Sequence, residues 1–400
     1  QERYGVEVDL RELGGFFRAL EAIPPSVNAA SMVGHGTIRG LVVGSENRPA
    51  TQEELARMRE MVSRALAQGA VGFSTGLEYA PSGFGSREEL VELAKALKGT
   101  GYPYASHMRN EDDGVVAAVE EALHIGKVAE VPVQISHLKA QGERNWWKAP
   151  VILDMLEEAR AAGVDVHFDR YPYVAYSTTL SNLFPNSARS GGTQAFLERL
   201  QDPDQLPALE TYCREKVAQL GSWDSVQISS TRTQKNAWMR GRRLGEVARG
   251  QGVDPFELTQ QLLLEEGGSV GMIGFGMSEE NTALMLSHPL GMVCSDGSVY
   301  SPTSSSSPHP RSFGTFPRVL GHYVREKGVM PLETAIHKMT GMPAQKILLK
   351  DRGVIRPGAF ADLVAFDPAE VRDEATFEDS RRPPSGISHV VVNGVVTVRE

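Results

Sequence analysis

The sequence is short of cysteine, of long apolar runs and of positive charge. Its two cysteines, Cys213 and Cys294, are too few for a disulfide framework, which fits a reducing compartment such as the cytoplasm. No apolar run approaches the roughly 20 residues that cross a bilayer, so we do not expect a membrane protein. Acidic residues outnumber basic ones by 50 to 41, for a formal charge of −9. Because phosphate binding needs clustered Lys and Arg, we do not expect a nucleic-acid partner either.

The rest of the composition is typical of an ordinary folded protein. The chain has 400 residues, of which 41% are hydrophobic and 23% are charged, and neither value indicates disorder. This length suits one large domain with a small appendage, or two domains. An eight-stranded (β/α) barrel alone takes about 250 residues. A barrel with a further small domain therefore fits the length.

Short apolar runs alternate with helical patterns over most of the chain, which is typical of βαβ units and a parallel sheet. Segments 51–54 and 86–89 have the pattern of capping boxes that begin helices. From residue 351 onward, β-branched runs separated by turns replace the alternation. We therefore predict an α/β fold, with a barrel domain over residues 1–350 and part of a small β domain over residues 351–400. The candidate strands, one or two of which we expect outside the barrel, are 27–33, 71–74, 102–106, 131–136, 164–168, 226–229, 271–275 and 292–294.

Three histidines recur at the ends of these candidate strands. His107, His137 and His167 follow one another at intervals of 30 residues, about one βα unit each. In (β/α) barrels the C-terminal ends of the strands carry the active site. One strand-end histidine is as often a hydrogen-bonded structural residue, but three in register favour a site. Neutral imidazoles joined by a carboxylate or thiolate suit zinc, and we expect His137 and His167 to be metal ligands.

Other polar residues are candidates for the same site. Asp296 follows the candidate strand 292–294, where a carboxylate can take the proton of an attacking water and pass it to a leaving nitrogen. A turn or helix-cap aspartate is the alternative. Arg311 could clamp a substrate carboxylate, and Lys139 and His309 could reach the same cavity. A solvated position is the alternative for these side chains.

Seven short sequence motifs make the chain similar to a known protein family. They are GFSTGLEY at 72–79, SHMRNE at 106–111, ISHLK at 135–139, DRYPY at 169–173, SDG at 295–297, HPR at 309–311 and RPGAFAD at 356–362. Together they make the chain resemble the N-acyl-D-amino acid deacylases, or D-aminoacylases, of the amidohydrolase superfamily. The resemblance implies a (β/α)8, TIM-like barrel with a small β domain, and zinc held by His137 and His167. It also implies that Asp296 is the catalytic aspartate and that Arg311 receives the α-carboxylate of the substrate. His107 then lines the cavity instead of binding metal.

The resemblance implies an activity as well. A zinc-dependent enzyme of this family hydrolyses the amide bond of a small N-acyl-D-amino acid to a carboxylate and a free D-amino acid. A cyclic-amide hydrolase of the dihydroorotase or hydantoinase kind is one alternative, and a catalytically silent fragment is another. Hydantoinase-like enzymes usually carry a carboxylated lysine where this chain has Ser106-His107-Met108, which counts against the first alternative. The sequence predicts neither the preferred side chain or acyl group nor the oligomeric state.

One departure from the family lies at the start of the chain. Family members begin with a strand that carries a His-x-His pair, followed by a strand that carries a metal-bridging cysteine. Neither feature occurs in this sequence, which starts at Gln1. We therefore expect a barrel that lacks its first one or two strands, with an incomplete metal site and exposed sheet edges. A signal peptide upstream of Gln1 is left open.

Overall fold

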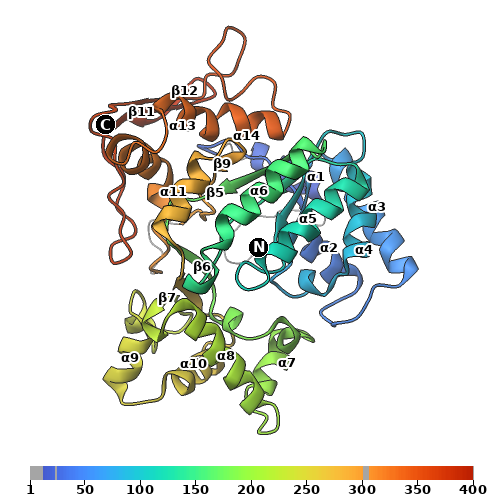
Figure 1. The fold of residues 1–400 in the computed structure, drawn as a ribbon, viewed down its shortest axis with the longest axis vertical. Helices are drawn as coiled ribbons and strands as arrows, with labels where there is room; N and C mark the ends of the chain where they lie inside the picture. The colour runs from blue at the N-terminus through green and yellow to red at the C-terminus, as the bar shows by residue number, and fades with distance from the viewer. Residues whose placement is uncertain (1–11, 23–24, 301–305, 400) are drawn as a thin grey trace.

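A parallel sheet of six strands, in the order β1-β2-β3-β4-β5-β9, forms the centre of the molecule. The computed structural model describes residues 12–22, 25–300 and 306–399 (Figure 1). Helices connect the strands and lie outside the sheet, which is the arrangement of a (β/α) barrel. This confirms the predicted fold class, although the described residues supply six parallel strands and not eight. The strands are β1 (Val33–Gly34), β2 (Phe73–Gly76), β3 (Tyr104–His107), β4 (Val133–Ile135), β5 (Val166–Arg170) and β9 (Gly291–Val293).

Most candidate strands of the barrel lie where the sequence predicted them. The exception is segment 27–33, in which only Val33 belongs to a strand. Residues 27–30 are exposed, with Val27 at 58%, whereas Val33 packs against the core. The apolar run therefore gave a false signal over its exposed part.

The strands are in register, so that large apolar side chains share one face of the sheet and small or polar side chains share the other. Partners across the sheet share a face because side chains alternate along each strand. The face that packs against the helices includes Phe73, Tyr104, Val133 and Val166. The opposite face, toward the barrel interior, includes Ser74, Ala105, Gln134 and His167. The covering helices are α2 (His35–Val42), α3 (Gln52–Ala67), α4 (Arg87–Ala94), α5 (Val115–Ala129), α6 (Lys148–Ala161) and α11 (Glu279–Ser287).

The predicted capping box of α3 is complete, whereas that of α4 has only one of its two hydrogen bonds. At α3, Thr51 accepts a hydrogen bond from the backbone of Glu54, and the Glu54 carboxylate accepts one from the backbone of Thr51. At α4, Ser86 accepts from the backbone of Glu89. The Glu89 carboxylate, however, is buried against His35 and Arg39 and does not return to the cap. A buried cation binds it more strongly than an exposed backbone N–H would.

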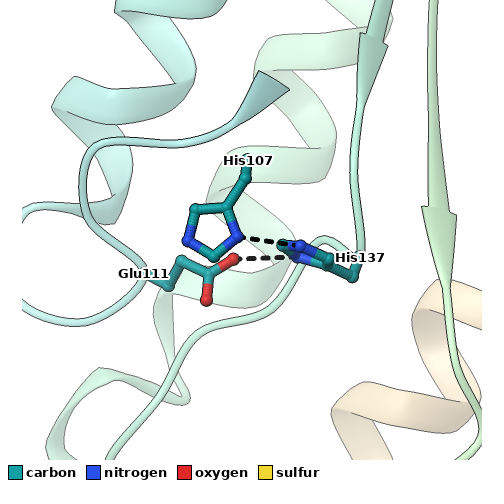
Figure 2. A group of neighbouring side chains, drawn as sticks. All are labelled: His107, Glu111 and His137. Carbon is teal, nitrogen blue, oxygen red and sulfur yellow. Dashed lines mark hydrogen bonds and ion pairs between the residues drawn. The ribbon is translucent and has the colours of Figure 1, made fainter. Parts of the chain in front are cut away.

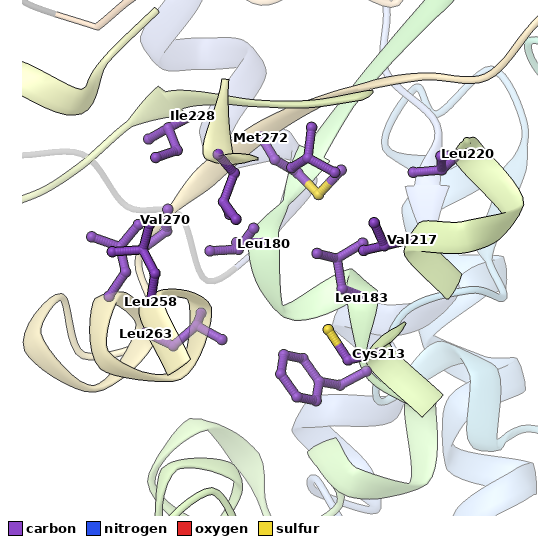
Figure 3. Packing of buried hydrophobic residues seen from close by; sticks show 14 of the residues in the cluster. Leu180, Leu183, Cys213, Val217, Leu220, Ile228, Leu258, Leu263, Val270 and Met272 are labelled. Carbon is purple, nitrogen blue, oxygen red and sulfur yellow. The ribbon is translucent and has the colours of Figure 1, made fainter. Parts of the chain in front are cut away.

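A second unit is inserted between β5 and β9, and the sequence did not predict it. Its antiparallel sheet has the order β6-β8-β7, with β6 (Ala175–Thr179), β7 (Val226–Ser230) and β8 (Gly271–Phe275). The candidate strands 226–229 and 271–275 are therefore strands, and they lie outside the barrel sheet, as was expected for one or two of the candidates. The sheet packs on helices through side chains such as Leu180, Val217 and Met272 (Figure 3). These helices are α7 (Gly192–Arg199), α8 (Leu206–Leu220), α9 (Leu244–Gln251) and α10 (Pro255–Glu265).

The last part of the chain contains four helical segments and a third sheet, shown in orange and red in Figure 1. This antiparallel sheet has the order β10-β11-β12, which confirms the predicted small β domain. The boundary at residue 350 stays a prediction. The sheet comprises β10 (Leu363–Phe366), β11 (Ile387–Val392) and β12 (Val395–Arg399). The helical segments are α12 (Arg311–Arg318), a π-helix η8 (Val319–Glu326), α13 (Leu332–Met339) and α14 (Gly341–Lys346).

The remaining helical elements are short. No helix in the described ranges is both long and apolar enough to span a bilayer. One helix, α1 (Leu13–Ala22), precedes the barrel strands. The 3-10 turns are η1 (Ser82–Phe84), η2 (Lys95–Leu97), η3 (Glu143–Asn145), η4 (Leu180–Leu183), η5 (Asn186–Arg189), η6 (Trp223–Ser225) and η7 (Ala237–Met239).

A glycine at the contact between α5 and β4 provides a test of this packing. A Cβ atom at Gly126 would lie 2.0 Å from Cγ2 of Val133. We expect Gly126→Ala to destabilise the fold by about 1–3 kcal/mol, because the core overpacks. Gly250 of α9 is a matched control, because a Cβ atom there meets nothing within 4 Å. Gly250→Ala should stabilise by about 0.5–1 kcal/mol. Urea unfolding measures the free energy of unfolding of both variants. Equal changes in the two variants would contradict the close contact between Gly126 and Val133.

Candidate active site

A cavity of about 180 Å³ lies at the C-terminal ends of the barrel strands. Most of the predicted site residues line it, namely His107, His137, Lys139, Asp296 and Arg311. The other lining residues were not predicted: Glu78, Tyr79, Glu111, Tyr171, Tyr176, Ser177 and Asn182. The first four of these lie within the stretches that carry the family resemblance, which was the signal that could have found them. Tyr176, Ser177 and Asn182 come from the inserted unit, which had no such signal.

Two histidines and a glutamate that line this cavity point toward one another (Figure 2). His107 ends β3, Glu111 follows four residues later, and His137 comes just after β4. His107 Nδ1 lies 2.9 Å from His137 Nε2, and His137 Nδ1 lies 3.0 Å from Glu111 Oε1. One ligand atom from each residue falls within 4.8 Å of the others. Two imidazoles and a carboxylate at this spacing are a donor set that zinc accepts.

The electrostatics of the three residues suit a cation-binding site. Burial opposes the ionisation of Glu111, but Lys139 and His107 outweigh it and hold the pKa of Glu111 well below its usual range. Burial and the neighbouring Lys139 lower the pKa of His137. Burial also acts to lower the pKa of His107, but Glu111 and Glu78 outweigh it and raise that pKa. A charged carboxylate beside a neutral His137 is what metal binding requires.

Lys139 completes this cluster. Its Nζ lies 2.6 Å from Glu111 Oε1 and 2.7 Å from His137 Nδ1, and the side chain is 3% exposed. Gln141 Nε2 donates a further hydrogen bond of 2.8 Å to Glu111. Glu111 is therefore ionised in a buried position because several donors surround it. Lys139 lines the cavity, as predicted, and its ammonium group contacts Glu111 and His137.

Asp296 and Arg311 form a second group of side chains in the cavity. An Arg311 nitrogen lies 2.7 Å from Asp296 Oδ2. The guanidinium carbon of Arg311 also lies 4.8 Å from the centre of the Tyr171 ring, so a cation–π contact holds it in place. Asp296 is 36% exposed, whereas Arg311 is 7% exposed. A fixed cation beside a more open carboxylate can receive an anionic substrate group.

His309 does not line the cavity. Its Nε2 lies 2.9 Å from the Ala175 carbonyl oxygen, and its Nδ1 accepts a hydrogen bond of 3.0 Å from the backbone of Arg311. Since a carbonyl only accepts and a backbone N–H only donates, the proton must be on Nε2. Burial and Arg311 hold the pKa of His309 well below its ordinary value. His309 therefore fixes the chain at Arg311 and has no contact with the cavity.

His167 also lies away from the cluster. In the sheet, His167 pairs with Gln134, and Gln134 lies three residues before His137 in the chain. Three residues of strand correspond to about 10 Å. Its Nδ1 lies 3.3 Å from Lys346 Nζ and 3.4 Å from Asp165 Oδ1, toward the N-terminal end of β5. The structure therefore does not bring His167 and His137 together as the sequence predicted. The spacing of 30 residues did not determine how far along its strand each histidine lies.

The turn that carries Glu78 and Tyr79 is held from three directions. Arg189 of the inserted unit donates a hydrogen bond of 2.9 Å to the carbonyl of Glu78. Arg109, which follows β3, donates one of 2.7 Å to the carbonyl of Gly83. Ser82 Oγ lies 2.8 Å from the ring of the buried His35. These contacts place the Glu78 carboxylate 3.3 Å from His107 Nε2.

A parallel (β/α) sheet with imidazoles and carboxylates gathered at its C-terminal edge defines a metal-assisted hydrolase. The chain belongs to the amidohydrolase family, whose family model matches residues 18–398. It is 39% identical to a D-aminoacylase of Alcaligenes xylosoxydans xylosoxydans, over 98% of this chain and 73% of that protein. It is 36% identical to an N-acyl-D-glutamate deacylase of the same organism, over 96% of this chain and 69% of that protein. The resemblance to the D-aminoacylases is thereby confirmed.

Solved structures agree with these sequence relatives. A crystal structure of D-aminoacylase matches with a TM-score of 0.80 and 38% identity, over 97% of this chain and 72% of the other. An N-acyl-D-glutamate deacylase from Bordetella bronchiseptica, complexed with zinc and a phosphonate inhibitor, matches with a TM-score of 0.81 and 34% identity. That match covers 96% of this chain and 72% of the other. The barrel with a small β domain is therefore the fold of a known subset of this family.

Proposed function

We propose that this chain hydrolyses the amide bond of N-acyl-D-amino acids with zinc as its cofactor. The observation that carries the proposal is a single cavity that holds both the His107–Glu111–His137 cluster and the Asp296–Arg311 pair. The first group suits a metal ion. In the second group, Arg311 suits an anionic group of the substrate, and Asp296 suits the transfer of a proton. The deacylase relatives, including the zinc complex, support this reading.

The residues present fit zinc. His107, Glu111 and His137 would hold it, since their donor atoms converge and Glu111 keeps its charge. When bound, zinc polarises the amide carbonyl and lowers the pKa of a water molecule. The sequence had paired His137 with His167, and the geometry favours His107 and Glu111 in place of His167.

The other residues of the cavity have roles that follow from their contacts. Arg311 would bind the α-carboxylate of the substrate, which takes the place of Asp296 beside the guanidinium. Asp296 is then free to accept a proton from the attacking water and to donate it to the leaving nitrogen. The products are a carboxylate and a free amine. Tyr171 packs against both Lys139 and Arg311 and excludes water from their buried sides.

The proton transfer leads to the first test. With N-acetyl-D-methionine as substrate, we expect Asp296→Asn to lower kcat at least 100-fold, because an amide cannot carry the proton. Its zinc content should equal that of the parent, because Asp296 is not among the proposed ligands. Steady-state kinetics and elemental analysis measure the two quantities. Ordinary turnover by Asp296→Asn would overturn the assignment, and a parent that turns over hydantoin but not the D-amide would favour a cyclic-amide hydrolase.

The metal ligands are tested by a pair of histidine substitutions. His137→Asn should lose most of the bound zinc together with activity, because it removes the central ligand of the cluster. His167→Asn should keep zinc at the level of the parent, because His167 lies in a different layer of the barrel. Elemental analysis after dialysis against a weak chelator measures zinc. Loss of zinc from both variants would instead support the pairing predicted from the sequence.

We also propose a small molecule as the partner and the cytoplasm as the location. The formal charge of −9 argues against a nucleic-acid partner, because phosphate binding needs clustered Lys and Arg. Cys213 and Cys294 are both free thiols, which fits a reducing compartment. Cell fractionation measures the location, and recovery of the protein in the culture medium would contradict it.

A further inference from the structure

One carboxylate in the cavity has no part in the proposed reaction. Glu78 lies in the turn after β2, and its side chain is 15% exposed. One of its oxygens lies 3.3 Å from His107 Nε2, and the other lies 3.6 Å from Lys216 Nζ. His107 is already shared with His137, and Lys216 is closer to Asp112, at 2.5 Å. Glu78 therefore shares both neighbours with other groups, and its carboxylate lines the cavity.

The cations that line the cavity are already paired with other carboxylates. Lys139 lies 2.6 Å from Glu111, and Arg311 lies 2.7 Å from Asp296. In the proposed reaction Arg311 exchanges Asp296 for the α-carboxylate of the substrate. Among the lining residues that the structure describes, no cation is then left for a second carboxylate on the same substrate.

The wall beside Glu78 is neutral and can form hydrogen bonds. It is built from Tyr79 and from Tyr176, Ser177 and Asn182 of the inserted unit. Tyr79 is fixed by a hydrogen bond of 3.1 Å between its hydroxyl and Thr178 Oγ1. Hydroxyl and amide groups of this kind can hydrogen-bond a neutral polar side chain, but they bring no positive charge to set against a second carboxylate beside Glu78.

We propose, on the basis of the proposed function, that Glu78 is a specificity-determining residue that excludes substrates with an acidic side chain. The preferred substrates are then N-acyl-D-amino acids with a neutral side chain. Two like charges within one buried cavity repel each other strongly, because little water lies between them. A site without a partner for a charged group can reject it by a factor of about 10 to 100 or more.

The sharpest comparison uses N-acetyl-D-glutamine and N-acetyl-D-glutamate, which have the same shape and differ by one charge. For the zinc-loaded parent, we expect kcat/KM to favour the glutamine substrate at least tenfold. Glu78→Gln should bring the ratio of the two values toward one, mainly through faster turnover of the glutamate substrate. A merely structural role of Glu78 would lower both values together and leave the ratio unchanged.

A matched control removes a charge elsewhere. Glu60→Gln makes the same chemical change at an exposed position of α3 and should leave the ratio as in the parent. Two results would overturn the proposal: a parent that prefers the glutamate substrate, or a ratio that Glu78→Gln does not change. If the parent turns over neither of these substrates nor N-acetyl-D-methionine, the proposed function fails. Calorimetric binding of D-glutamine against D-glutamate to the parent and to Glu78→Gln then still decides the role of Glu78.

Discussion

The buried carboxylate of Glu111 is the contact on which the rest of the site depends. An isolated carboxylate would be neutralised by protonation at 3% exposure, because desolvation favours the uncharged form. Glu111 stays charged because Lys139, Gln141 and His137 surround it. Glu111 belongs to the loop after β3, and its three partners belong to the segment after β4. The same charge that suits a metal ion therefore ties two neighbouring strand ends together and orients His137 between them.

The barrel was predictable from the sequence because the short apolar runs that form its strands alternate with segments of helical pattern. The local pattern says little, however, about the sheet to which an apolar run belongs. Val226–Ser230 and Gly271–Phe275 have the same buried character as the barrel strands, yet they pair antiparallel in the inserted unit. Orientation is decided by contacts distant in sequence, such as the pairing of β6 with β8. The inserted unit supplies part of the cavity wall, so that wall was also beyond prediction.

The site was predictable to the extent that its residues end strands. The recurrence of His107 and His137 reflects successive βα units, and both line the cavity. The same recurrence misplaced His167, because a shift of a few residues along a strand changes the layer that a side chain occupies. Glu78 and Glu111 lie in loops, where no periodicity marks a residue as facing inward. Their roles emerge only from contacts with His107 and Lys139, which the fold creates.

The orientation of His137 depends on a feature that no spacing argument contains. Val133 and Ile135 of β4 face the helices, so a regular strand would also turn residue 137 toward the helices. His137 instead has a φ of 39°, in the left-handed region that side chains rarely adopt. The backbone accepts this cost because the Asp169 carboxylate and carbonyl hold the N–H groups of His137 and Leu138 at 2.7 and 2.8 Å. Breaking the alternation of the strand is what turns the imidazole into the cavity, beside His107 and Glu111.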